Sequence, residues 1–429
     1  MRALVRSAMA GRLRSAGTSV SYTFRALRVR NYRLFWTGQL ISLTGTWAQE
    51  VAQAWLVLKL TNSPLILGTV VTVRFLPTLL FSLFGGVFAD RFPKRRVLFA
   101  TQTTLMLQAL VVGVLVWTGA IQLVYIYIVA ALRGLVDSFD QPTRQAFIVE
   151  LVGPDELPNA VALNSTQFNA ARIVGPAIGG ILVATVGIAT CYFVNAASFL
   201  VVLWSIARMR PREFHLGPRA ARGNMLRQVG AGLRYSVTTP DVALVLLLLL
   251  MLGTFGYNFP VVLPLLAKYT LHTGAGGLGL LMASLGVGSL VAALAIAYTG
   301  KASRRMLFVG AGAFSLLLFA VAAVPTAILA VPLLVALGFA SILFMATANT
   351  LLQLGSAPQF RGRVMSLWAL LFMGTTPIGS LVIGWLSERW SVRLAVEGMA
   401  VACMVGVGVA LLYLRRLRRP VPASAGGTA

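Results

Sequence analysis

The chain has 429 residues, of which 58% are hydrophobic and 11% charged, and its mean hydropathy is +0.83. A soluble protein of this length cannot bury so large an apolar fraction, so the composition excludes an ordinary soluble domain and indicates a membrane protein. The net charge of +25 would also suit a nucleic-acid binder. Its basic residues cluster between apolar segments, however, which is the pattern of membrane topology, and we expect no nucleic-acid partner.

The apolar segments predict an all-α integral membrane protein, because a spanning helix needs about 20 mostly apolar residues. We expect twelve transmembrane helices, arranged as two pseudo-symmetric six-helix bundles. In chain order, the predicted helices cover residues 34–59, 65–89, 97–118, 121–143, 161–186, 189–209, 241–267, 275–299, 306–324, 327–354, 364–387 and 394–414.

The charge distribution divides the chain into five predicted parts. Eight arginines precede the first helix, and seven more lie between residues 208 and 234, whereas alternate loops carry few charges. The positive-inside rule therefore puts both termini and the linker in the cytoplasm, and we expect a multi-pass protein of the bacterial inner membrane. The first 30 residues lack the apolar core of a signal peptide. The parts are an N-terminal tail (1–33), a first bundle (34–209), a linker (210–238), a second bundle (239–414) and a C-terminal tail (415–429).

The two halves resemble each other in sequence. A Gly-Pro-Ala-Ile-Gly-Gly run at 175–180 has a counterpart, Thr-Pro-Ile-Gly-Ser, at 376–380. Small residues let helices approach closely, and proline bends a helix. We therefore expect helix packing to be the role of Gly175, Pro176, Gly179 and Gly180.

The first predicted helix has a polar side. Residues Gln39, Ser42, Thr46, Gln49, Glu50 and Gln53 fall within an arc of about 100° on an α-helix. A charge inside a spanning helix is unfavourable and marks function, so Glu50 is the first candidate for proton coupling. The alternatives are a structural acid paired with Arg74 or Arg172, or an acid at the wet outer end of the helix.

Further charged residues lie inside the predicted helices. Arg133, Asp137 and Asp140 share one face of the fourth helix, where they could support proton transfer or form an internal salt bridge. Arg74 and Arg172 could meet an anionic substrate, hold Glu50, or only balance charge. The remaining candidates for the substrate cavity, with structural packing or lipid contact as the alternative, are Gln39, Thr46, Gln49, Gln53, Phe168, Tyr257, Asn349 and Gln353.

The basic run between the second and third helices is the most specific motif. Gly86 is followed four residues later by Asp90, then by Arg91 and a cluster that contains Arg95. The run resembles the gate loop of the major facilitator superfamily, although Pro93 stands where that family usually has glycine. Strings at 30–35, 157–165 and 360–366 resemble the branch that contains enterobactin exporters and drug-efflux proteins, the transmembrane secretion effectors.

The resemblance implies roles for these residues. Asp90 would accept hydrogen bonds from the start of helix 11 and pair with Arg363, closing the cytoplasmic side. Arg95 would pair with Asp137 or Asp140. In the family, an arginine in helix 4 often tunes proton transfer, which suits Arg133. Here that arginine is followed directly by glycine, which departs from the usual spacing.

The expected function is proton-coupled export, by alternating access, of a small amphipathic molecule such as a drug, siderophore or secondary metabolite. Proton-coupled uptake is an alternative, and a non-transporting sensor or scaffold is an alternative of another class. We expect no enzyme, cofactor or metal site, because two cysteines and two histidines lie far apart and no nucleotide-binding loop is present. The expected partners are the substrate, protons and the bilayer, and we expect a monomer. The substrate, the coupling stoichiometry and the role of Glu397 stay open.

Overall fold

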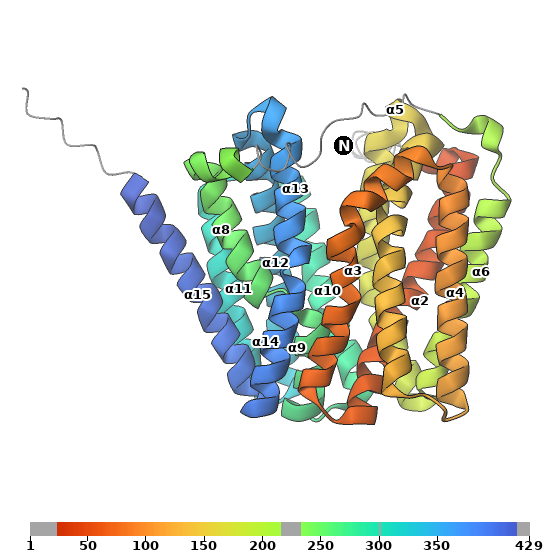
Figure 1. Ribbon diagram of the computed structural model, residues 1–429. Coiled ribbons are helices and arrows are strands. Elements are labelled where there is room, and N and C mark those ends of the chain that lie inside the picture. The colour runs from red at the N-terminus through yellow and green to blue at the C-terminus, as the bar shows by residue number, and fades with distance from the viewer. Residues whose placement is uncertain (1–23, 216–232, 300–301, 418–429) are drawn as a thin grey trace, which may run out of the picture. The chain divides into compact units, whose positions relative to one another are not determined.

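The computed structural model describes residues 24–215, 233–299 and 302–417. Within these ranges it does not describe the side chains of residues 82–84, 86, 87, 89, 90, 297, 299, 373 and 417. Every regular element in the described ranges is a helix (Figure 1). Ten helices there are long and apolar enough to cross a membrane. The predicted all-helical membrane class is therefore confirmed, because helices satisfy every backbone polar group internally, as lipid requires.

The chain forms two compact units. The first consists of Met1–Leu56 with Leu80–Ala221, and the second of Val57–Leu79 with Arg222–Ala429. Residues 57–79 thus precede most of the first unit in sequence but belong to the second. The division falls inside two continuous helices, α2 (Arg30–Thr61) and α3 (Pro64–Arg91).

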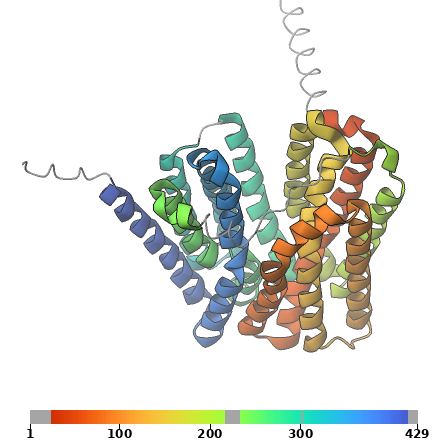
Figure 2. The same cartoon turned by 45° about the horizontal axis from the view of Figure 1, so that its top comes forward.

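The first unit is a bundle built on α2, the end of α3, α4 (Lys94–Trp117), α5 (Leu123–Thr185) and α6 (Ile188–Ala207). In Figure 2 these helices run side by side, and α4 packs on both α5 and α6. Two short 3₁₀ turns, η1 (Arg25–Arg28) and η2 (Pro211–Glu213), flank the bundle.

The most extended element is α5, whose 63 residues would span about 95 Å, roughly three bilayer cores. It changes direction at Gly153, where φ is +73° and ψ is 176°. Glycine has no Cβ, so it adopts this conformation without a steric penalty. The expected loop at 144–160 is wrong, because these residues are helical on both sides of that break.

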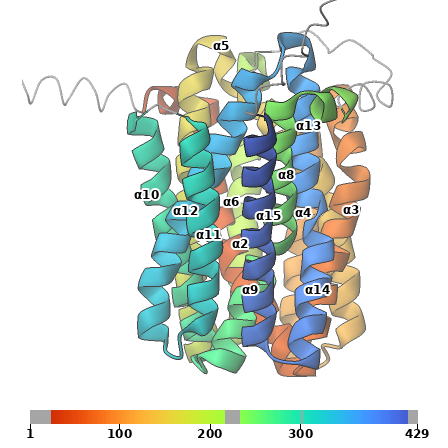
Figure 3. The ribbon, with the colours of Figure 1, turned by 90° about the vertical axis from the view of Figure 1, so that its left-hand side faces the viewer.

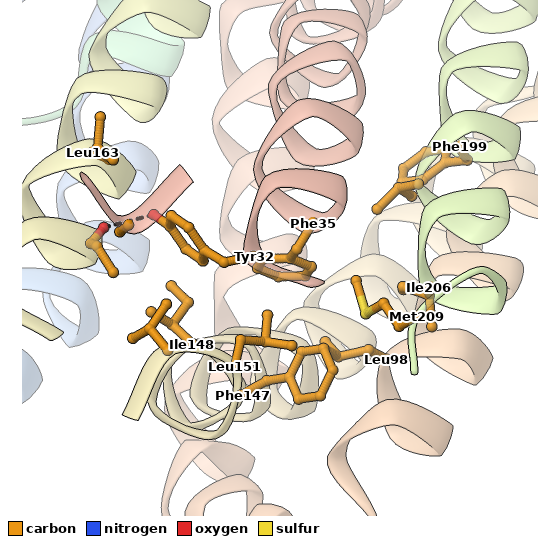
Figure 4. Packing of buried hydrophobic residues seen from close by; sticks show 14 of the residues in the cluster. Tyr32, Phe35, Leu98, Phe147, Ile148, Leu151, Leu163, Phe199, Ile206 and Met209 are labelled. Carbon is orange, nitrogen blue, oxygen red and sulfur yellow. Dashed lines mark hydrogen bonds between the residues drawn. The ribbon is translucent and has the colours of Figure 1, made fainter. Parts of the chain in front are cut away.

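The helical conformation of residues 144–160 follows from their packing. Phe147 and Leu151 are fully buried in an apolar cluster at this end of the bundle, together with Tyr32 and Phe35 of α2 (Figure 4). The rings of Phe35 and Phe147 meet edge to face at 5.6 Å, and the Tyr32 hydroxyl donates to the Ala160 carbonyl at 2.8 Å. A loop would lose this buried apolar face, so the helix is the favoured conformation.

The second part of α5 lies against α2 through glycines. A Cβ on Gly175 would come within 2.4 Å of the Trp47 Cβ, and one on Gly179 within 2.5 Å of the Ala48 carbonyl oxygen. Only glycine therefore permits this close helix contact. Pro176 and Gly180, next to these positions, are also buried.

From residue 240 to the end of α15, the described part of the second unit contains nine helical elements. Figure 3 shows α11 beside α12 and α15, and α12 also packs on α10. The elements are α8 (Pro240–Phe255), α9 (Phe259–Leu265), the π-turn η3 (Leu266–Thr270), α10 (Gly274–Thr299), α11 (Arg304–Ala323), α12 (Ala327–Gly355), α13 (Pro358–Gly374), α14 (Thr376–Arg389) and α15 (Val392–Leu417).

Two expected helices of this unit are interrupted. The segment predicted at 241–267 breaks between α8 and α9, and the one at 364–387 breaks at Thr375 between α13 and α14. The breaks lie side by side, because a Cβ on Gly379 would come within 1.9 Å of the Thr254 carbonyl oxygen. In this unit α14 packs closely on α8 through Gly379, as α5 packs on α2 through Gly175 and Gly179 in the first unit.

Residues 57–79 dock onto α14 within the second unit. The Glu388 carboxylate accepts hydrogen bonds from the Ser63 hydroxyl at 2.8 Å and from the Leu65 backbone amide at 3.2 Å, at the start of α3. Further along, the Thr72 hydroxyl donates to the Pro377 carbonyl at 3.0 Å. A Cβ on Gly68 would come within 2.4 Å of the Ser380 carbonyl oxygen.

Candidate functional site

The first unit brings together three charged side chains predicted for proton coupling. The Arg133 guanidinium, on α5, lies 3.0 Å from a carboxylate oxygen of Glu50 on α2 and 3.7 Å from one of Asp137, one turn further along α5. Only 7% of the Arg133 side chain is exposed. This Glu50–Arg133–Asp137 cluster was expected only in part, because Arg74 and Arg172 were the partners considered for Glu50.

The cluster joins two helices through a single guanidinium. Arg133 of α5 pairs with Glu50 of α2 and with Asp137 of its own helix, and both helices are long enough to cross a bilayer. Charged groups inside such helices are unfavourable and tend to have a function.

Asp140 forms a second, separate cluster. It lies nearer to the end of the bundle at which α4 begins, with Lys94. Its carboxylate is fully buried and accepts hydrogen bonds from the Thr101 hydroxyl at 2.7 Å and the Gln102 amide at 2.8 Å. Arg144, one turn later on α5, also pairs with it. These donors fix Asp140 in place.

The polar side of α2 faces the inside of the bundle. Gln49 accepts a hydrogen bond of 2.6 Å from the amide of Asn195 on α6, and the Thr46 hydroxyl lies 3.5 Å from the same side chain. Gln39 and Gln53 are also buried. The expected polar stripe is therefore present, and its members contact neighbouring helices of their own unit.

The gate residues are described only in part. Gly86 and Asp90 lie in α3, but their side chains are outside the described residues, so the contact between Asp90 and Arg363 stays a prediction. Arg91 is exposed. Arg95 donates to the carbonyls of Ile206 and Ala207, both at 3.0 Å, so the expected pairing with Asp140 is wrong.

Arg363, the other half of the predicted gate, lies near the start of α13. Its guanidinium sits 5.2 Å from the ring centroid of Phe360. Phe360 in turn stacks on Tyr235 at 4.4 Å, and the Tyr235 hydroxyl accepts a hydrogen bond from the Ala357 amide. These contacts hold the start of α13 against the segment that follows the linker.

The remaining cavity candidates divide between the units. In the first unit, Phe168 meets Trp47 edge to face at 5.8 Å, and Arg172 is half-buried. In the second, the Arg74 guanidinium lies 5.6 Å from the Phe75 ring centroid. Gln353 donates to Asn349 at 2.6 Å on an exposed part of α12.

Tyr257 occupies the break between α8 and α9. Its ring stacks on Phe314 at 4.8 Å and meets Phe372 edge to face at 5.3 Å, while its hydroxyl donates to the Ser341 carbonyl at 2.8 Å. This aromatic group fills the space beside the interrupted helix. The orphan acid Glu397, in α15, accepts a bond from Arg393 at 2.8 Å.

Several residues of the polar clusters were missed in the sequence. Arg144 has a clear signal, because it follows Asp140 at the i, i+4 spacing of helical ion pairs. Asn195 and the glutamines of α4 stand out only as amides within apolar segments. Tyr192 gives no such signal, yet it is buried within electrostatic range of Glu50 and Arg133.

Comparison with known sequences gives consistent matches over nearly the whole chain. The family described as transmembrane secretion effector matches residues 21–423. The staphyloferrin A transporter of Staphylococcus aureus is 23% identical, covering 87% of this chain and 94% of its own length. The multidrug efflux pump Tap of Mycolicibacterium fortuitum is 26% identical, covering 86% and 91%. The enterobactin exporter EntS of Citrobacter koseri is 26% identical, covering 92% and 95%.

Solved structures share the fold at low sequence identity. A bacterial homologue of the human lysosomal transporter Spinster, inward-facing and unoccupied, has a TM-score of 0.71 at 14% identity and covers 94% of this chain and 99% of its own. A POT family transporter in complex with a thioalcohol-conjugated peptide has a TM-score of 0.73 at 10% identity, with 91% and 97% covered. At these identities the likeness concerns the fold.

Proposed function

Because the chain belongs to the transmembrane secretion effector family of the major facilitator superfamily, it is a multi-pass membrane transporter and not an enzyme, and we propose that it exports a small amphipathic molecule in exchange for protons. The substrate class is a drug, a siderophore or a related secondary metabolite. The names of three relatives, a siderophore exporter, a staphyloferrin A transporter and a drug pump, support this class.

The observation that carries proton coupling is the Glu50–Arg133–Asp137 cluster. A buried guanidinium pairs with two partly buried carboxylates in helices that are long enough to span a bilayer. Charged groups inside a spanning bundle are unfavourable and tend to have a function. A carboxylate of this cluster would bind one proton and release it once per transport cycle.

We also propose the twelve-helix arrangement. In it, α5 crosses the membrane twice, on either side of Gly153, while α8 with α9 and α13 with α14 each make one interrupted crossing. With α2, α3, α4, α6, α10, α11, α12 and α15 this gives twelve. The basic segments then lie in the cytoplasm with both termini, in the inner membrane of a bacterial cell. Reporter fusions after residues 62, 118 and 215 test the orientation, the first two being expected outside and the third inside.

The test of proton coupling uses everted membrane vesicles with an imposed pH gradient, acid inside. Enterobactin and the dye ethidium serve as probes, and internal pH is followed with a trapped indicator. Wild type should release protons when a transported probe is added, and Glu50→Gln should abolish the release, because it removes the carboxylate proposed to bind the proton.

The matched control is Glu397→Gln, which removes an acid paired at the surface of α15 with Arg393. It should transport and release protons as wild type does. Probe fluxes that do not depend on the pH gradient would contradict the proton-coupled mechanism. Movement of probe and protons in the same direction would indicate uptake in place of export.

A further inference from the structure

The interior of the first unit contains buried polar atoms that the protein itself does not satisfy. The side-chain oxygens of Gln53, Gln102 and Gln108 and the amide nitrogen of Gln39 are inaccessible to solvent and have no hydrogen-bond partner among the described residues. A buried amide without a partner is unfavourable by about 1–3 kcal/mol, and proteins normally satisfy such groups with ordered water. Four of them in one bundle therefore need a common explanation.

Two of these glutamines contact α5, which carries a stripe of charged residues. Arg133, Asp137, Asp140 and Arg144 fall within an arc of about 60°, and they extend over about 16 Å of that helix. From α4, Gln102 donates to Asp140 at 2.8 Å and Gln108 donates to the Val129 carbonyl at 3.1 Å. Two amides of α4 thus meet α5, one at Asp140 and one a turn before Arg133.

From the other side, α2 meets this face through Glu50. Gln39, Thr46, Glu50 and Gln53 fall within an arc of about 60°, over about 21 Å of helix. The ion pair between Glu50 and Arg133 joins the two stripes. Because Phe35 of α2 packs on Phe147 of α5 at the bundle end, the helices run in opposite directions, which brings Gln39 to the level of Asp140 and Arg144.

We propose that these stripes enclose a narrow hydrated path inside the first unit, which conducts the coupling proton between Glu50 and the end of the bundle at Arg144. The proposal rests on the proposed proton coupling and names its route. Gln39, Gln102 and Gln108 are positioning residues that bind the bridging waters through their unsatisfied atoms. Asp140, held by three donors, anchors the path at its end.

The proton movement along this path is balanced. The carboxyl of Glu50 or Asp137 gives its proton to an adjacent water, and that water passes a different proton to the next. No bond to carbon is made or broken, and the carboxylate is restored when its proton has left. In this proposal the proton stays within one bundle and moves between α2, α4 and α5.

The first experiment detects the water directly and needs no transport substrate. X-ray hydroxyl-radical footprinting, on the full chain in lipid nanodiscs, oxidises side chains next to bound water. Tyr192 is near Glu50 and Arg133, whereas Tyr32 bonds to Ala160 in the apolar cluster, and both are 1% exposed. Tyr192 should be oxidised much faster than Tyr32. Equal slow oxidation of the two would overturn the proposal.

The second experiment removes the water-binding atoms. Met has nearly the shape of Gln without its amide, so Gln102→Met with Gln108→Met should preserve packing. Loss of one hydrogen bond to each bridging water should lower Tyr192 oxidation about tenfold. Thr104→Val, on the exposed side of α4, is the matched control and should change nothing.

The third measurement links the water to the proton. Infrared spectroscopy follows the carboxyl band of Glu50, assigned by its loss in Glu50→Gln, after a rapid pH change. The double Met variant should respond about tenfold more slowly than wild type. Water at Tyr192 with an unchanged carboxyl response would reject the path as a proton route. Probe export that ignores the pH gradient would instead reject the proposed function.

Discussion

Arg133 joins two carboxylates of the first unit. It pairs with Glu50 of a different helix and with Asp137 of its own, and it is almost completely buried. Removing one partner of a buried ion pair leaves an uncompensated charge, which is far more unfavourable than never having had the pair. The stability of the protein should therefore depend on keeping all three charged side chains of the cluster together.

Replacing Arg133 should expose this dependence. Arg133→Gln should lower the stability of the protein by about 3 kcal/mol, because two carboxylates would lose the guanidinium with which they pair. The additional change Glu50→Gln should recover much of that loss, because it removes one of the two. Thermal unfolding of the purified variants in detergent measures both. A double variant no more stable than Arg133→Gln would contradict the assigned pairing.

At the scale of the element, glycines decide how closely helices pack. Gly179, which contacts α2, and Gly379, which contacts α8, each follow the proline of the repeated motif, and each would bring a Cβ close to a backbone carbonyl of the partner helix. Helix association in lipid relies on such close contacts, because burial of apolar surface from water contributes little between helices in a membrane. The repeated motif is thus a packing device.

A single methyl group tests this device. Gly179→Ala would bring a Cβ to within 2.5 Å of the Ala48 carbonyl oxygen, and the backbone of α2 must shift to relieve the clash. We expect a clear loss of thermal stability and of folded yield. Gly408→Ala, in α15, meets no atom within 4 Å and should be neutral or slightly stabilising, since alanine favours a helix by about 1 kcal/mol over glycine. Equal effects of the two changes would argue against the packing role.

At the scale of the whole molecule, residues 57–79 are the notable exception to the division into halves. They follow the first helix in sequence but group with the second unit, held there by Glu388, Pro377 and Ser380 of α14. Alternating access requires the halves to separate on one side at a time. We therefore expect these contacts to open in the outward-open form of the proposed transport cycle.

Weakening this attachment should favour the open form. Glu388→Gln replaces the carboxylate that caps the start of α3, an exposed contact worth about 0.5–1 kcal/mol, so opening should increase about threefold. The variant Thr72→Cys measures this opening, because a thiol reagent added outside the cell should label the new thiol faster when the contact is open. The native Cys191 and Cys403 are completely buried and give a low background. Arg393→Gln is the control, and labelling unchanged by Glu388→Gln would contradict the assignment.

The amino-acid sequence by itself determined the membrane class, the positions of most helices, the family resemblance and the identity of the charged residues, because hydropathy and local motifs are read within one segment. The spacing on α5 even placed Arg133, Asp137 and Asp140 on one face. Periodicity cannot say which helix that face meets, however, and only the tertiary structure joined Glu50 to Arg133 and separated Asp140 from Arg95. The helix at 144–160, the breaks beside Gly379 and the grouping of residues 57–79 were likewise decided by packing between segments far apart in the chain, where the choice among possible partners depends on shape and on the desolvation of polar groups.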